Sequence, residues 1–251
     1  MQALLSFDQA PPFAAPFRFF VTAPLFAILA GILLLWSGPE LFASRWTPSA
    51  LALTHLVTAG FMMQAMLGAM LQILPVAVGA NIVKPLRVAS IVHAAISVGA
   101  LLLAAAFLSY NALAFAFAAA SLGLGVFVFI GAAAHALHRV PTITPTIRGI
   151  KLALLGLGVT VSLGMLLAVA QGSALGEVLG GSLMPLVDIH LTWGWMAWGG
   201  VLLAAVAYVV VPMFQLTPAY PDWFGQAYSG ALLSSVALWT CLLYTSPSPR
   251  D

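Results

Sequence analysis

Charged residues are scarce in this sequence, and their scarcity decides the class of protein. Only 6% of the 251 residues are charged and 63% are hydrophobic, with a mean hydropathy of +1.09. Water-soluble domains carry roughly a quarter charged residues, so this chain lacks the side chains needed to cover a water-exposed surface. A formal net charge of +2 also argues against a nucleic-acid partner. The sequence predicts a polytopic membrane protein whose main partner is the lipid bilayer.

Several signatures of chemistry are missing as well. The single cysteine, Cys241, excludes an internal disulfide. The sequence has no CxxC, HExxH, Walker or GxGxxG pattern, and no carboxylate lies deep within an apolar stretch. The last absence argues against a carrier that couples transport to protons or sodium through a buried Asp or Glu.

Apolar segments long enough to cross a membrane are plentiful. A bilayer core of about 30 Å takes about 20 residues of helix. Seven segments reach or approach that length: 17–36, 50–75, 89–108, 112–137, 149–171, 187–214 and 226–243. We therefore predict an all-α transmembrane helix bundle, with a lead-in at residues 1–16, the bundle at 17–239 and a tail at 240–251.

The tail differs in character from the rest of the chain. The stretch TCLLYTSPSPRD interrupts an apolar segment and resembles translated sequencing-adaptor read-through. We therefore expect residues 240–251 to be non-native, and the natural chain to continue beyond Trp239.

Positive charges are distributed asymmetrically between the two ends of the predicted spans. If the spans alternate in direction, only Arg45 lies on the side opposite the N-terminus. Six lie on the N-terminal side: Arg18, Lys84, Arg87, Arg139, Arg148 and Lys151. Because positively charged segments stay in the cytoplasm, we predict a cytoplasmic N-terminus, in the inner membrane of a bacterium.

Two histidines stand at matching depths, about one turn from the outer face. His55 begins the second span and His190 begins the sixth. Ionisable residues inside a membrane are costly and usually face the bundle interior or a site, and neutral imidazole binds haem iron, copper and zinc. The alternative is that each imidazole hydrogen-bonds a backbone carbonyl or a headgroup. We treat His55 and His190 as candidate cofactor and metal ligands.

The residues that follow His55 suggest a lining for such a site. At about 100° per residue, His55 shares a stripe with Ala59, Met62, Met66 and Ile73. The thioethers would wall a porphyrin or line a path for Cu(I), or else simply fill gaps between helices. Two glutamines lie off this stripe and are expected to hydrogen-bond other helices: Gln64 and Gln72.

The sixth span carries further candidates around His190. Trp193 lies among three tryptophans in six residues, which either anchor the helix at the interface or wall a cofactor. Asp188 either orients an imidazole from outside or is a solvated residue at the helix start. Three other histidines lie toward the cytoplasm and either interact with helix ends or hold a second haem or metal: His93, His135 and His138.

The second and sixth spans also echo each other. The former reads HLVTAGFMMQAMLGAMLQILPV and the latter HLTWGWMAWGGVLLAAVAYVVVPMF. Both open with His-Leu, continue with Gly, an aromatic residue and Met, and close on a proline. The spacing from the histidine to the proline differs by two residues between them, so the echo is either a coincidence or an internal repeat of the kind that is common in membrane bundles.

The motif HLVTAGFMMQAMLGAMLQILP resembles the second helix of the catalytic subunits of haem-copper oxidases and nitric oxide reductases. That helix carries a haem-ligating histidine, a Gly-Ala pair and a Leu-x-Pro-like exit, which His55, Gly68–Ala69 and Leu74–Pro75 match with a one-residue slip. The stretch HLTWGWMAW is similar to the sixth helix of that superfamily, and the pattern also resembles the NnrS group of bacterial membrane proteins. The resemblance implies that His55 ligates haem b or a metal.

The sequence also differs from that family at the positions of the copper ligands. Its sixth helix carries a copper-ligating histidine where this chain has Trp198 and Gly199, and its His-His pair on the seventh helix has no counterpart in GQAYSGALLSSVALW. The resemblance therefore does not imply a complete oxidase or reductase.

Three functions remain open from the sequence. The favoured one is haem b or metal binding near the outer face, for electron transfer with a respiratory partner or for handling nitric oxide or copper. The second is a transporter or permease-like protein, with Cu(I) as one candidate substrate, and the third is a structural or assembly subunit without a cofactor. The first would use His55, His190, Met62, Met66 and Trp193, and the second His55, Met62, Met66 and Met70.

Overall fold

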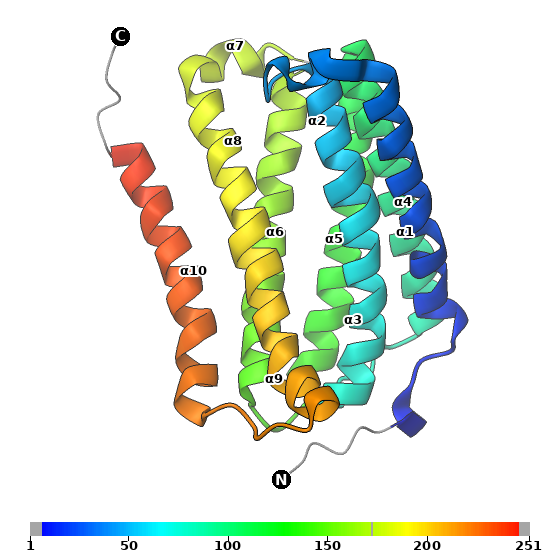
Figure 1. The fold of residues 1–251 in the computed structure, drawn as a ribbon, viewed down its shortest axis with the longest axis vertical. Helices are drawn as coiled ribbons and strands as arrows, with labels where there is room; N and C mark the ends of the chain where they lie inside the picture. Colours follow the sequence, from blue (N-terminus) through cyan, green and yellow to red (C-terminus); the bar gives the residue numbers. More distant parts are fainter. Residues whose placement is uncertain (1–6, 172, 246–251) are drawn as a thin grey trace.

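A computed structural model describes residues 7–171 and 173–245 of the chain as a bundle of long helices (Figure 1). Seven helices are long and apolar enough to cross a membrane: Ala14–Ala43, Pro48–Val78, Pro85–Ser109, Ala112–His138, Pro145–Gln171, Leu183–Gln215 and Trp223–Leu243. Each contains the corresponding predicted segment, and no strand occurs within the described residues. The predicted all-α multi-pass bundle is confirmed.

The α-helical elements are α1 (Ala14–Ser37), α2 (Pro48–His55), α3 (Met63–Val78), α4 (Pro85–Ser109), α5 (Ala112–His138), α6 (Pro145–Gln171), α7 (Leu175–Leu179), α8 (Leu183–Thr192), α9 (Val201–Gln215) and α10 (Asp222–Thr245). Three short 3₁₀ segments add η1 (Phe7–Gln9), η2 (Gly38–Ala43) and η4 (Gly180–Ser182). The second and sixth spans are composite. A π-helical segment, η3 (Leu56–Met62), joins α2 to α3, and another, η5 (Trp193–Gly200), joins α8 to α9.

Three helices begin earlier than hydropathy predicts because each begins with a proline. Pro48, Pro85 and Pro145 each stand first in their helix. Proline is well tolerated there, since the first N–H of a helix has no partner within the helix. Upstream of Pro48, the Thr47 hydroxyl caps the helix by accepting from the Ala50 N–H at 3.2 Å. As a result His93, predicted at a helix start, lies about two turns inside α4.

The third and fourth spans form a tight hairpin whose turn consists of Tyr110 and Asn111. Tyr110 adopts a left-handed conformation with φ +52°, which ends α4. The Asn111 side chain then accepts from the Ala114 N–H at 3.0 Å and caps α5. The antiparallel neighbours pack closely because Gly99 leaves room for Leu122, whose Cγ would lie 2.7 Å from a Cβ at position 99.

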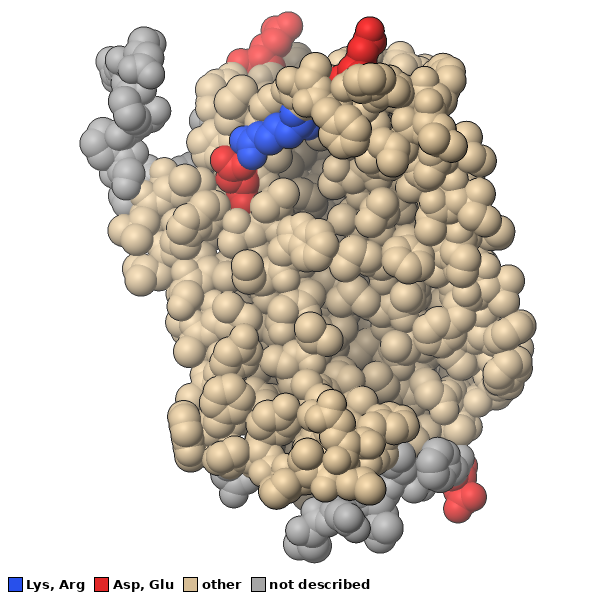
Figure 2. Space-filling model, viewed as in Figure 1, with Lys and Arg blue, Asp and Glu red and all other residues tan. Residues whose placement is uncertain are grey.

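One hydrophobic core contains residues from each of the first six spans, and a second contains residues near one end of the first five. Large side chains of the main core include Phe19, Leu67, Ile96, Phe129, Ile150 and Trp198. The outside of the bundle is also apolar: Leu25, Ile28 and Ile32 of α1 are all exposed. In the face shown in Figure 2 the charged side chains lie toward the two ends and the wide middle is uncharged. An apolar exterior of this kind suits lipid.

The two ends of the bundle can be named from the charge distribution. We refer to the end where α1 finishes and α2 begins, uppermost in Figure 1, as the outer end, following the predicted orientation. Of the predicted lead-in, residues 1–6 lie outside the described chain, and α1 begins at Ala14. Of the predicted tail, Thr240 to Thr245 continue α10, and residues 246–251 lie outside the described chain.

Candidate functional site

The two outer-end histidines lie next to each other in the bundle. His55 is the last residue of α2, and His190 lies two residues before the end of α8. Their ring centres are 6.4 Å apart and their ring planes differ by 18°. Two imidazoles separated by 135 positions in the sequence are thus brought together in near-parallel orientation, and each lies seven residues after the first residue of its span.

Each imidazole is oriented by a backbone carbonyl. The Nδ1 of His55 lies 2.8 Å from the carbonyl oxygen of Leu51, and the Nδ1 of His190 lies 2.9 Å from that of Thr160. Because a carbonyl only accepts, Nδ1–H donates in both rings. A neutral imidazole in this tautomer keeps its Nε2 lone pair for a ligand. The backbone-carbonyl interpretation and the ligand interpretation are therefore compatible.

The side of each ring is packed by another span. Phe107 of α4 lies 5.1 Å from the His55 ring, centre to centre, and in turn packs edge-on against Phe115 at 5.1 Å. Gly164 of α6 lies against His190, since a Cβ at position 164 would be 2.9 Å from its Cε1. The His190 ring thus occupies space that only glycine leaves open.

The contribution of α6 is a feature that the sequence analysis missed. Thr160 supplies the carbonyl for His190, and Gly164, one turn later, supplies the space beside the ring. A signal was available: Gly156, Thr160 and Gly164 recur every four residues, a spacing of small residues typical of a close helix–helix contact in membranes. Gly156 indeed meets η5, where a Cβ would lie 2.5 Å from the Ala197 carbonyl oxygen.

Both histidine-bearing helices contain a π-helical segment just inside the histidine. η3 starts one residue after His55, and η5 starts three residues after His190. Such segments are rare and occur often at functional sites. Their matching positions extend the similarity between the second and sixth spans from sequence to backbone geometry.

The π-helical segment η3 changes which residues lie on the same face of the span as His55. The stripe assumed about 100° per residue, an angle that does not apply through the π-helical residues of η3. Met62 and Met66 are both half-buried. The most deeply buried side chains of α3 form a different set: Gln64, Leu67, Met70, Leu71 and Leu74. The argument that placed Met62 and Met66 on the same helix face as His55 therefore no longer holds. Their role as lining residues stays a prediction.

Two residues near His190 are engaged elsewhere. The indole N–H of Trp193 donates to the Thr240 hydroxyl of α10 at 3.0 Å. Asp188 accepts from Arg45 at 3.0 Å, and the Arg45 guanidinium lies 4.5 Å from the ring centre of Trp46. Asp188 is therefore a partly exposed residue that pairs with Arg45, and it is not the group that orients the Nδ1 of His190.

The glutamine prediction is confirmed for Gln64. Its side chain is fully buried and its Nε2 donates to the Ser97 hydroxyl of α4 at 2.7 Å. For Gln72, which is half-buried, the structure gives no side-chain hydrogen bond among the described residues. Gln64 therefore links two spans in the middle of the bundle.

The three histidines away from the outer end do not gather into a site. His93 Nε2 lies 2.8 Å from the Thr22 hydroxyl of α1, and its ring packs edge-on against Phe19. His135 and His138 are exposed in the last turn of α5, as the helix-end interpretation expects. Within residues 7–171 and 173–245, no three His, Cys, Asp or Glu side chains come together as a metal site. The outer pair is thus a two-ligand arrangement.

No family model, curated protein or solved structure matches this chain. The interpretation of the histidine pair therefore depends on its geometry.

Proposed function

We propose that His55 and His190 are the two axial protein ligands of a haem b, and that the chain is an electron-transfer protein of a bacterial inner membrane. The observation that carries the proposal is the distance of 6.4 Å between two near-parallel imidazoles. Metal–nitrogen bonds of about 2 Å place two imidazoles on opposite sides of one metal with ring centres about 6 Å apart. A tetrahedral arrangement would bring the centres closer together.

The number of ligands favours a metal in a macrocycle over a bare ion. A porphyrin supplies four nitrogens, so an iron within it needs only two ligands from the protein. Protein zinc sites, in contrast, use three or four side chains. The described residues offer the pair His55 and His190 without a third His, Cys, Asp or Glu close by.

The residues around the pair fit this role. Both Nδ1–H groups are held by carbonyls, which fixes each ring and directs the ligand function to Nε2. Phe107 beside His55 excludes water from that ring. Bound haem would supply one-electron exchange.

Absorption spectra of the purified full chain titrated with haemin test the proposal. Wild type should bind one haem and show a reduced-minus-oxidised difference with sharp bands of a six-coordinate haem. His55→Ala and His190→Ala should each lose it, and His135→Ala, an exposed histidine at the other end of the bundle, is the matched control. A wild-type chain without a Soret shift on haemin addition would overturn the haem proposal.

A second candidate uses the same geometry. Cu(I) accepts two nitrogens in a linear arrangement, and thioethers such as Met62 and Met66 suit this soft ion. Metal content by mass spectrometry after growth in copper, with and without His190→Ala, separates the two. One Cu(I) per chain without haem binding would favour copper handling. A chain that binds neither species would leave a structural or assembly subunit.

A further inference from the structure

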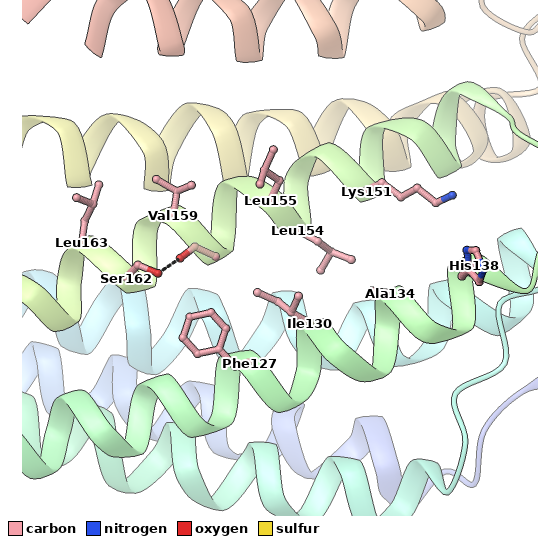
Figure 3. A pocket seen from close by; sticks show the side chains of 11 residues that line it. Phe127, Ile130, Ala134, His138, Lys151, Leu154, Leu155, Val159, Ser162 and Leu163 are labelled. Atoms are coloured by element: carbon pink, nitrogen blue, oxygen red, sulfur yellow. Dashed lines mark hydrogen bonds between the residues drawn. The ribbon is translucent and has the colours of Figure 1, made fainter. Parts of the chain in front are cut away.

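A groove runs along the lipid-facing side of α5 and α6, separate from the histidine pair. It has a volume of about 600 Å³. Its walls include Phe127 and Ile130 of α5 and Leu155 and Val159 of α6 (Figure 3). The Ser162 hydroxyl in the wall donates to the Gly158 carbonyl at 2.8 Å, so its proton is not available to a ligand. Most of the groove is therefore apolar.

The two basic side chains of the groove lie at one end of it. Lys151 and His138 lie together at the cytoplasmic end in Figure 3, away from Phe127 and Leu163. Both side chains are exposed, and neither has a hydrogen-bond or ion-pair partner among the described residues. A lysine without an acidic partner at the end of an apolar groove is suited to an anion that carries a hydrocarbon chain.

The length of the groove matches one leaflet of a bilayer. From Lys151 to Leu163 the α6 axis rises by about 18 Å, at about 1.5 Å per residue. One leaflet contributes about half of a hydrocarbon core of about 30 Å. An acyl chain that started at Lys151 would therefore lie in the groove over about the depth that a lipid tail reaches in its own leaflet.

We propose that this groove binds one anionic phospholipid of the cytoplasmic leaflet, with an acyl chain between α5 and α6 and its phosphate at Lys151 and His138. The proposal is independent of the histidine pair at the outer end. A zwitterionic lipid would fill the same apolar slot without the additional attraction of a net negative charge. One lysine near a membrane surface contributes about a fivefold preference for an anionic lipid.

Native mass spectrometry of the purified full chain tests the proposal. The chain, in neutral detergent, is titrated with phosphatidylglycerol and with phosphatidylcholine of the same acyl chains. Wild type should take up one phosphatidylglycerol about fivefold more tightly than phosphatidylcholine. Lys151→Gln should abolish that preference, whereas Lys84→Gln, the control at the same end of the bundle but outside the groove, should keep it.

A second variant tests the slot itself. A Cβ at Gly158 would lie 3.6 Å from the nearest atom, Ile130 Cδ1, so Gly158→Leu can be accommodated and its side chain fills the groove. This variant should bind both lipids more weakly than wild type does and should keep the helix content of wild type. Equal affinity of wild type for the two lipids would overturn the proposal, as would equal losses in the two lysine variants. A dimer without lipid would assign the groove to a second copy of the chain.

Discussion

The imidazole of His190 lies against the backbone of Gly164, and a Cβ at that glycine would come within 2.9 Å of Cε1. Gly164→Ala should therefore displace the ring and weaken ligand binding by the factor of about 10 to 100 that is usual for groups that orient a ligand. Haemin titration, or copper binding if haem does not bind, measures the change. Gly158→Ala on the same helix is the control, since its new methyl group meets only ordinary contact. Equal losses in the two variants would contradict the prediction.

The contact of Gly156 with the Ala197 backbone predicts an effect on stability. A methyl group at position 156 would lie 2.5 Å from a carbonyl oxygen, and backbone cannot rotate away as a side chain can. Gly156→Ala should lower the free energy of unfolding by about 1 to 3 kcal/mol, as overpacking usually does. The measurement is reversible unfolding in mixed micelles. Gly31→Ala, with no atom within 4 Å of the new Cβ, should not be destabilising.

The buried Gln64 side chain donates a hydrogen bond to the half-buried Ser97 across two spans. Interhelical hydrogen bonds in membrane proteins contribute about 0.6 kcal/mol on average. A double-mutant cycle of Gln64→Leu and Ser97→Ala, read by the same unfolding assay, should give a coupling of about that size. Additive effects of the two substitutions would show that the bond contributes no net coupling.

The ion pair of Arg45 and Asp188 joins the loop before α2 to α8, directly outside the histidine pair. Their side chains are 60% and 36% exposed, so Asp188→Asn should change the free energy of unfolding by less than about 1 kcal/mol. Because His190 is oriented by the Thr160 carbonyl instead of Asp188, ligand binding should be unchanged. A shifted Soret band in Asp188→Asn would contradict this assignment.

The predicted orientation has a direct test. In a Cys241→Ser background, a cysteine at Glu177 should react with a membrane-impermeant maleimide in intact cells, whereas one at Arg139 should react only after lysis. Both positions are exposed and lie at opposite ends of the bundle. The reverse pattern would place the N-terminus outside.

Much of this fold follows from hydropathy, because lipid requires long apolar helices and leaves few alternatives. The errors at helix starts arose from Pro48, Pro85 and Pro145, whose low hydropathy hides their good fit at a first helical position. Equal depth of His55 and His190 was also readable, because each lies at the same end of its span.

The contacts of the site were less readable. Hydropathy does not distinguish π-helical from α-helical turns, so the face below His55 was assigned with the wrong angle. The ion pair of Asp188 with Arg45 depends on two residues 143 positions apart, and no local pattern connects them. The sequence predicts that an imidazole inside a membrane needs a hydrogen-bond partner. It does not show that Thr160 of α6 supplies the carbonyl for His190, or that Gly164 leaves the space beside its ring.

The π-helical segments η3 and η5 uncouple the two halves of each histidine-bearing span. In an α-helix, one residue more or less turns everything beyond it by about 100°. A π-helical turn absorbs one such residue, so the cytoplasmic half can keep its buried face while the outer half keeps its histidine in place. Deleting one residue from 56–62 should therefore convert that stretch to an ordinary helix and leave both α3 and His55 in register with their neighbours.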